Sequence, residues 1–182
     1  AFKFACGFIA YAARQGVRLD AGFEKWLLDL VAIATVTDFM PLIGENRTLE
    51  RYGLIVLNKT RRPGLKKIIE TAGLTPGELD TTSVGFYIGP RINAASRMEH
   101  ASCAFETLMA ATDEEAMVLA TKLHQLNADR QKYTVEIMDA ARLQIAAAPP
   151  KHVCVIMGEG WSAGIVGLVA GKLVSELGMP VF

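Results

Sequence analysis

One carboxylate in an apolar stretch is the first residue of this sequence that is suited to chemistry. Asp38 lies in ATVTDFMPL, residues 34–42, between Val36 and Phe39. Burying a carboxylate is costly unless it is paired or binds a metal, so Asp38 is a candidate metal ligand. The alternative is a cap for the turn at Pro41. Hydrolytic manganese or magnesium centres need several ligands, and the sequence shows no other compact ligand cluster.

A second candidate site is GPRINAASR, residues 89–97, in which two arginines lie six residues apart. The guanidinium groups of Arg91 and Arg97, with Asn93 between them, can present forked donors to phosphate oxygens. The alternative is a pair of salt bridges that lock a long helix to its neighbours. The residues alone leave both interpretations open.

Other polar and glycine-rich segments give weaker signals. The basic cluster over residues 59–67 contains no acid and is typical of a solvated face, with phosphate contact as the alternative. None of the three histidines has the spacing of a metal motif. The glycines of GEGWSAGIVGLVAGKL match neither GxGxxG nor the Walker spacing. We therefore expect Gly164, Gly167 and Gly171 to allow tight packing of a helix on a sheet.

Hydrophobic periodicity predicts that helices position these candidates. Apolar residues at helical spacing predict helices over residues 1–15, 23–33, 46–57, 63–72 and 101–110. The segment 34–42 is expected to be buried and to deliver Asp38 to the end of a strand or helix. A break at Gly89–Pro90 is expected to precede Arg91.

A long helix is predicted from about residue 113 to residue 147. Thr112 and Glu115 have the spacing of a capping box, and Pro149–Pro150 stops the helix. At 1.5 Å per residue the helix would span roughly 50 Å. Its ends are apolar and its middle is almost wholly polar, which indicates a bridge between two packed bodies.

The residues after the long helix indicate the opening of an α/β domain. We expect a short buried strand over residues 152–157, a helix capped by Ser162, and a second strand after Gly178. This strand–helix–strand order is a β-α-β unit and implies a parallel pair of strands. The fold class is therefore α/β, with a domain boundary near residue 148 and a mostly helical part before it.

Composition and charge exclude several classes of protein. Among 182 residues, 19 Lys and Arg balance 19 Asp and Glu, and 51% are apolar. Such a chain is neither disordered nor a basic nucleic-acid-binding tail, so any nucleic-acid contact must come from a local patch. Three cysteines without a CxxC pair argue against a disulfide framework or a zinc cage. No apolar run approaches the roughly 20 residues of a membrane span, and we expect a soluble, cytoplasmic protein.

Three segments together resemble the RecJ family of single-strand-specific exonucleases, in the DHH phosphoesterase superfamily. ATVTDFMPLIGENRTLERYGL is similar to "GTVADVVPL…ENR…GL", and GPRINAASR is similar to "GPRLNAAGR". EGWSAGIVGLVAGKL resembles "WHxGVVGIVASRL", which opens the DHH-associated domain. The segments follow the family's order and cover nearly the whole chain from about residue 25. Because the first residue is Ala1, we expect an internal fragment of a longer protein.

The resemblance implies a role for each candidate residue. It makes Asp38 the last carboxylate of the DHH metal centre, which holds Mn²⁺ or Mg²⁺ and activates a water for attack on the scissile phosphate. It makes Arg91, Asn93 and Arg97 contacts to DNA phosphates, with Arg91 first among them. Lys172 would make a further substrate contact, because it keeps the charge of an arginine that is usual in the family.

The resemblance also implies a division of the chain. Residues 1–111 would be the mostly helical C-terminal part of the DHH catalytic domain, and residues 112–148 the long connector helix. Residues 149–182 would be the first β-α-β of the substrate-binding DHH-associated domain. Single-stranded DNA would pass through the cleft between these domains.

Some residues depart from the family's pattern. Ser162 replaces a usual His, Ser96 replaces a usual Gly, and Gly171–Lys172 replace a usual Ser–Arg. The Asp-His-His motif and the upstream aspartates are absent. Because one ligand cannot hold a metal pair, we expect the isolated fragment to be inactive.

The expected function is therefore that of a 5′-to-3′ exonuclease fragment that acts in DNA repair and recombination. The parent is expected to be a monomer that works with a helicase or a single-strand-binding protein, away from membranes. One alternative is a DHH phosphoesterase that acts on short oligonucleotides or cyclic dinucleotides. The other is a non-catalytic replication scaffold, against which the retained Asp38 argues.

Overall fold

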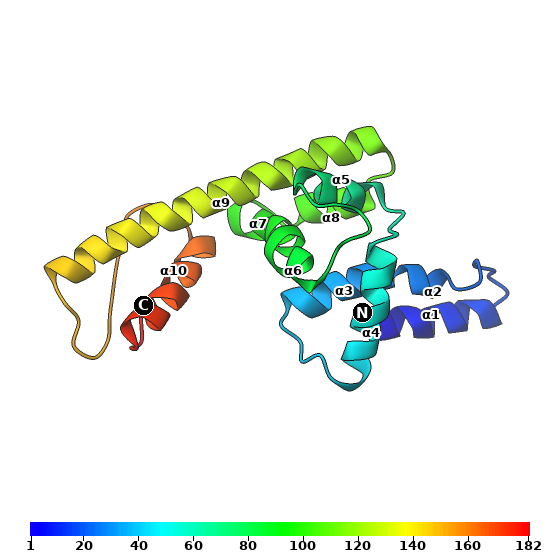
Figure 1. Ribbon diagram of the computed structural model, residues 1–182, viewed down its shortest axis with the longest axis horizontal. Coiled ribbons are helices and arrows are strands. Elements are labelled where there is room, and N and C mark those ends of the chain that lie inside the picture. Colours follow the sequence, from blue (N-terminus) through cyan, green and yellow to red (C-terminus); the bar gives the residue numbers. More distant parts are fainter.

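The long helix α9 (Asp113–Ala147) is the longest element, and the other elements lie on one side of it (Figure 1). The structure is a computed structural model that describes all 182 residues. The remaining elements, nearly all helical, are α1 (Phe2–Arg14), α2 (Phe23–Trp26), α3 (Leu28–Thr37), α4 (Gly44–Leu57), α5 (Pro63–Thr71), α6 (Thr81–Ser83), the π-helical turn η1 (Val84–Ile88), α7 (Gly89–Met98), α8 (Ser102–Met109) and α10 (Ala163–Leu177).

Local sequence explains both ends of α9. The Thr112 hydroxyl accepts a hydrogen bond from the Glu115 backbone N–H at 3.2 Å, and the Glu115 carboxylate accepts one from the Ala111 N–H at 3.0 Å. Three acidic residues in the first turn also stabilise this end, because their negative charges interact favourably with the positive N-terminal end of the helix dipole. The helix ends just before Pro149–Pro150, so the predicted long helix is confirmed.

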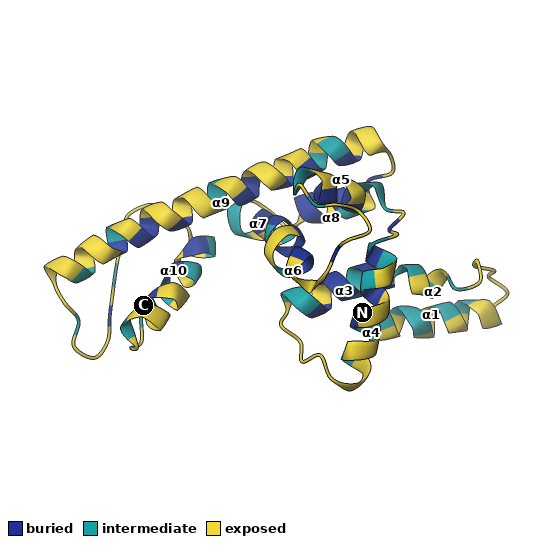
Figure 2. Cartoon of the chain, in the orientation of Figure 1, coloured by how far each residue is buried: buried dark blue, intermediate teal, exposed yellow.

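Two separate hydrophobic clusters lie against α9. The first contains fifteen buried residues, among them Leu123 and Leu126 of α9. The second contains six, in which Ile137 and Met138 of α9 pack against α10. Figure 2 shows buried residues on the side of α9 that faces the other helices. The polar middle of α9 lies between the clusters, so the helix bridges two packed bodies as expected.

The structure is almost wholly helical, so the predicted α/β class and its β-α-β unit are not confirmed. Cys154 and Val181 form one isolated parallel bridge and no longer ladder. The Cys154 N–H donates to the Pro180 carbonyl oxygen at 2.9 Å, and the Phe182 N–H donates to the Cys154 carbonyl oxygen at 2.9 Å. The parallel direction is as predicted. A pair of short strands with no further neighbour has too few hydrogen bonds and too little apolar contact to extend.

Two helix boundaries also differ from the prediction. The helix expected over residues 23–33 is divided into α2 and α3, and α3 continues to Thr37. The segment 34–37 is therefore helical and only partly buried. Gly89–Pro90 does not interrupt the helical conformation, because α6, η1 and α7 follow one another without a gap. The wider π-helical turn before Pro90 accommodates a residue that has no N–H to donate.

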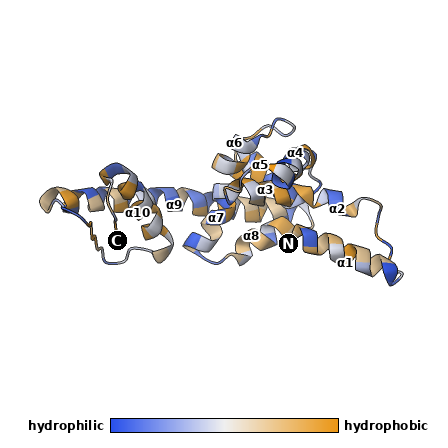
Figure 3. Cartoon of the chain, turned by 90° about the horizontal axis from the view of Figure 1, so that it is seen from below, coloured by the Kyte–Doolittle hydropathy of each residue, from blue (hydrophilic) through white to orange (hydrophobic).

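The N-terminal helix α1 is poorly buried. It contributes no buried residue, and Phe4 and Phe8 are 78% and 61% exposed. Figure 3 shows α1 at the edge of the molecule, with apolar residues along its length. None of the helices combines the length and the hydropathy that crossing a bilayer would require.

Candidate functional site

Asp38 lies at the C-terminal end of α3 and is exposed. Its carboxylate makes no hydrogen bond with the protein. Backbone bonds hold the following turn, from the Phe39 N–H to the Val36 oxygen and from the Met40 N–H to the Thr35 oxygen, both at 3.1 Å. The expectation that Asp38 is buried is therefore wrong, because α3 ends at the surface. Asp38 is the C-cap residue of α3 through its backbone N–H, which donates to the Ala34 carbonyl oxygen at 3.0 Å, but its carboxylate caps nothing.

The residue after Asp38 has an unusual backbone. Phe39 has a φ of +51° and is the one non-glycine residue with a positive φ, although its side chain is 93% exposed. This conformation costs an L-residue about 1–3 kcal/mol, and such residues gather at functional sites. The strained turn sets the direction of the backbone directly after Asp38.

Asp38 also lines a cavity of about 510 Å³ between α1, α3 and α4. The cavity is mostly apolar, and Asp38 is its one charged residue. No group of three or more His, Cys, Asp or Glu side chains gathers anywhere in the chain as a metal site would require. An exposed carboxylate without a hydrogen-bond partner fits a metal centre as one ligand, and this chain supplies no others.

A close approach of two helices brings Gly89 of GPRINAASR against Thr37, the residue before Asp38. Gly89, the first residue of α7, packs so tightly on α3 that a Cβ would overlap the methyl group of Thr37. Thr37 directly precedes Asp38. The two motifs, which are about fifty residues apart in sequence, therefore meet at the end of α3.

Arg91 is buried and links α7 to the long helix. One terminal nitrogen donates to the Tyr87 carbonyl oxygen at 2.8 Å, and the other lies 3.2 Å from Nδ1 of His124 on α9. Because a guanidinium can only donate, Nδ1 of His124 is the acceptor of this hydrogen bond. Burial lowers the pKa of the Arg91 guanidinium. These contacts favour a structural role for Arg91, which joins α7 to the long helix α9. The link is made by hydrogen bonds and not by a salt bridge.

Arg97 links α7 to α10. Its Nη1 donates to the carbonyl oxygen of Gly164 at 3.0 Å, and the side chain is half-buried. Asn93 lies one helical turn earlier, is exposed, and shares a face with Arg97. Lys172 is exposed on α10, eight residues after Gly164 and so about 12 Å further along the helix axis. The structure thus brings Asn93 and Arg97 together and leaves Lys172 apart.

Arg130 is a functional candidate that the sequence interpretation missed. It lies in the polar middle of α9, where Nη2 donates to Asn127 at 3.0 Å and buried Nε has no partner. Burial and the nearby charge of Arg97 lower the pKa of Arg130. Neither guanidinium forms an ion pair with a carboxylate, so together they are suited to attract a phosphate. The polar middle of α9 was the available sequence signal, but it does not reveal which of its residues feels the charge of Arg97.

Only one of the three glycines in α10 has the predicted packing role. A Cβ at Gly164 would lie 2.9 Å from the Arg97 Cα and closer still to its carbonyl oxygen, whereas Gly167 and Gly171 have nothing within 4 Å. The surface that Gly164 contacts is α7 and not a sheet. Ser162 caps α10 by accepting a hydrogen bond from the Gly164 N–H at 3.3 Å.

Gly164→Ala is expected to destabilise the contact between α7 and α10 by about 1–3 kcal/mol, the usual cost of overpacking. Gly167→Ala is the matched control and is expected to stabilise α10 by about 0.5–1 kcal/mol, because alanine favours a helix. Amide hydrogen exchange in α10 of the full-length protein measures both effects. Equal protection in the two variants would contradict the close packing at Gly164.

The sequence is similar to several curated exonucleases. It is 39% identical over 155 residues to the single-stranded-DNA-specific exonuclease RecJ of Bacillus subtilis, covering 85% of this chain and 20% of that protein. It is 36% identical over 154 residues to RecJ of Thermus thermophilus, covering 85% of this chain and 22% of that protein. The chain therefore spans about a fifth of the length of these relatives. No family model matches it.

The fold is similar to solved structures of the same kind of protein. RecJ of Thermus thermophilus in complex with Mg²⁺ matches with a TM-score of 0.79 and 32% identity, over 93% of this chain and 26% of that one. A structure of exonuclease RecJ bound to manganese matches with a TM-score of 0.79 and 32% identity, over 93% of this chain and 42% of that one. Sequence and structure thus confirm the resemblance that three short motifs predicted.

Proposed function

Because this chain corresponds in sequence and in fold to one segment of the RecJ exonucleases, we propose that it is part of a metal-dependent exonuclease acting on single-stranded DNA. The enzyme would hydrolyse phosphodiester bonds from the 5′ end, in DNA repair and recombination. The observation that carries this proposal is the close packing of Gly89 in GPRINAASR on Thr37, the residue directly before Asp38.

Asp38 is proposed as one oxygen ligand of the metal centre. The relatives of known structure hold Mg²⁺ or Mn²⁺, and both ions prefer oxygen ligands. Asp38 is suited to this role because its carboxylate is exposed, has no hydrogen-bond partner and opens onto a cavity. A divalent metal bound there would supply an activated water and neutralise charge on the phosphate. The isolated chain is proposed to be inactive, since it gathers no other ligands.

Phosphate contacts are proposed along the junction of α7, α9 and α10. The charge of Arg97 acts on Arg130 there, and neither arginine forms an ion pair with an acid. Exposed Asn93 lies on the same face of α7 as Arg97. Arg91 would be a positioning residue, because both of its terminal nitrogens are occupied within the protein. Lys172 would contact DNA further along α10.

The division into domains is also a proposal. Residues before about 112 would complete the catalytic domain, and α9 would connect it to the associated domain that begins near residue 149. The parallel bridge at Cys154 would be the first pairing of that domain's sheet. The monomeric state, the cytoplasmic location, and a helicase or single-strand-binding protein as partner stay predictions.

The test uses the full-length protein with Mn²⁺ and 5′-labelled DNA, as a single strand, a blunt duplex and a dinucleotide. Mononucleotides are expected from the single strand, and EDTA is expected to stop their release. Preference for the dinucleotide would favour a small-nucleotide phosphoesterase. No release from any substrate would favour a scaffold.

A further inference from the structure

The basic cluster at residues 59–67 does not form one continuous surface. Lys67 forms an ion pair with Glu70 at 2.8 Å on the surface of α5. Arg61 and Arg62 turn the other way, toward the N-terminal end of α3, where they line a cavity of about 630 Å³. A cavity of this size is within the range of small-molecule sites.

Arg62 is held rigidly at the wall of this cavity. Its Nε donates to the two carboxylate oxygens of Asp29 at 3.2 and 3.4 Å. Asp29 is only 2% exposed, and it also accepts hydrogen bonds from the Thr60 hydroxyl at 2.9 Å and the Leu30 N–H at 2.8 Å. A buried carboxylate with three donors fixes the position of the guanidinium.

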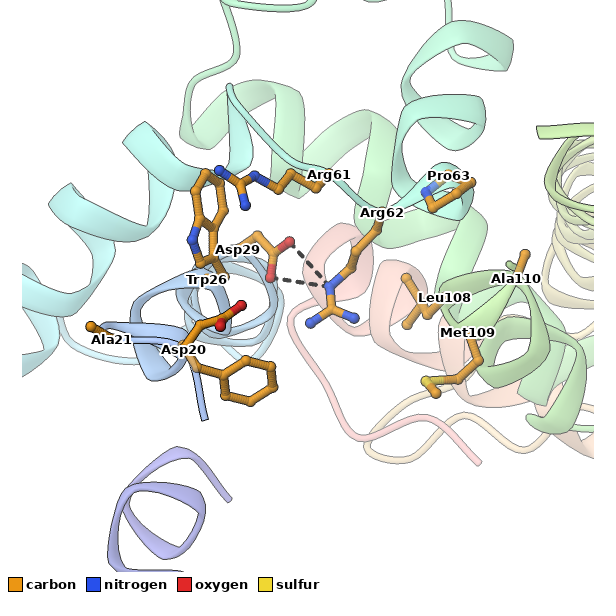
Figure 4. Close-up of a pocket in the computed structure, with 11 residues that line it drawn as sticks. Asp20, Ala21, Trp26, Asp29, Arg61, Arg62, Pro63, Leu108, Met109 and Ala110 are labelled. Carbon is orange, nitrogen blue, oxygen red and sulfur yellow. Dashed lines mark hydrogen bonds and ion pairs between the residues drawn. The ribbon is translucent and has the colours of Figure 1, made fainter. Parts of the chain in front are cut away.

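The remaining nitrogens of Arg62 are free to bind. Figure 4 shows both terminal amino groups pointing into the space between Asp20 and Met109, and neither makes a hydrogen bond with the protein. Two parallel N–H donors on a fixed guanidinium match the oxygens of a phosphate. The cavity therefore contains a preorganised anion contact.

The other walls of the cavity are suited to a planar ring. The Arg61 guanidinium stacks on Trp26, 3.7 Å from the ring centroid. Phe23 and Met109 also line the cavity and are 41% and 60% exposed. Stacking on an aromatic side chain such as Phe23 stabilises a nucleobase by about 1–3 kcal/mol. The Asp20 carboxylate would repel a bare phosphate and would accept a hydrogen bond from the amino group of a base.

From these contacts we propose that the cavity binds a nucleoside monophosphate whose base carries an amino group. Arg62 would bind the phosphate, the aromatic and apolar walls would bind the base, and Asp20 would accept from its amino group. The biological ligand rests on the proposed function, because mononucleotides are the product of such an exonuclease. Asp29 and Asp38 lie at opposite ends of α3, about 14 Å apart along its axis.

The test is calorimetric titration of the full-length protein with dCMP and with inorganic phosphate, in EDTA. Without divalent metal the titration reports binding independently of catalysis, so failure of the proposed nuclease activity does not affect the result. Wild type is expected to bind dCMP at least tenfold more tightly than phosphate. Arg62→Lys, which keeps the charge beside Asp29, is expected to weaken dCMP binding at least tenfold.

Met109→Glu is the second variant, because it adds an acid at an exposed wall and leaves the Asp29 pair intact. It is expected to weaken dCMP binding at least tenfold, whereas Val118→Glu, at a 71% exposed position on α9, is expected to leave it unchanged. If the wild-type protein does not bind dCMP at about 1 mM, the proposal is overturned. Equal affinity for inorganic phosphate, or unchanged binding in Met109→Glu, would also overturn it.

Discussion

Replacing Asp38 by Asn in the full-length protein is expected to reduce mononucleotide release from single-stranded DNA by at least about 100-fold. Loss of a side chain that only supports a metal ligand already costs about 10–100-fold, and Asp38 is proposed to bind the metal directly. An amide keeps the size of the side chain but carries no negative charge. The measurement is the initial rate on 5′-labelled single strands with Mn²⁺.

The same substitution is expected to leave stability unchanged. Asp38 is exposed and has no hydrogen-bond partner, so the thermal midpoint of Asp38→Asn should match that of the wild type. Asp139→Asn is the matched control, because Asp139 is an exposed carboxylate whose nearest cation, Arg142, is 3.8 Å away. Full activity in both variants would contradict a metal-binding role for Asp38 and would show that it only forms part of a surface turn.

Excess Mn²⁺ gives a second readout for Asp38. A weakened site should regain part of its rate at higher metal concentration, since lower affinity is offset by mass action. Asp139→Asn should show the wild-type metal dependence. A rate deficit in Asp38→Asn that no metal concentration changes would separate Asp38 from metal binding and favour a role in shaping the turn at Phe39.

The helices were predictable because their signals are local. Thr112 and Pro149 mark the ends of α9, and its change from apolar to polar residues and back indicated two packed bodies. The end of a helix or strand at Asp38 was likewise predictable from Pro41. These features depend on capping, proline geometry and periodicity, which operate within a few residues.

Features that depend on tertiary contact were not predictable. Nothing near Arg91 indicates that His124 and the Tyr87 carbonyl will occupy its nitrogens. Gly164 and Gly167 look equivalent in sequence, and only the crossing of α7 over α10 distinguishes them. The expected strands failed for a related reason, because a ladder depends on neighbours that one segment cannot specify.

Glu50 is the residue for which we expect the largest effect of pH on stability. It lies on the face of α4 that packs on α3, is 3% exposed, and neither carboxylate oxygen has a hydrogen-bond partner. The helices are close here, since a Cβ at Gly53 would lie 2.7 Å from the Leu28 carbonyl oxygen. Burial raises the pKa of Glu50 from 4.5 to about 7.

The sign of the effect follows from this raised pKa. Below pH 4.5 Glu50 is protonated in both the folded and the unfolded protein, and burial carries no charge penalty. Between pH 4.5 and pH 7 the unfolded protein releases this proton while the folded protein keeps it, so stability falls as pH rises. Above pH 7 the buried carboxyl is ionised in the folded protein too, and the loss is complete. The full loss is up to about 3 kcal/mol, because each pKa unit corresponds to 1.36 kcal/mol.

Glu50→Gln is therefore expected to raise the thermal midpoint of the full-length protein at pH 8 and to have little effect at pH 4.5. Glu78→Gln removes a carboxylate that is exposed in a loop and is the matched control, with no expected change at either pH. Stabilisation that is equal at both pH values would point to packing or amide hydrogen bonding. Only a gain that grows between pH 4.5 and pH 8 identifies the ionised carboxylate as the destabilising group between α3 and α4.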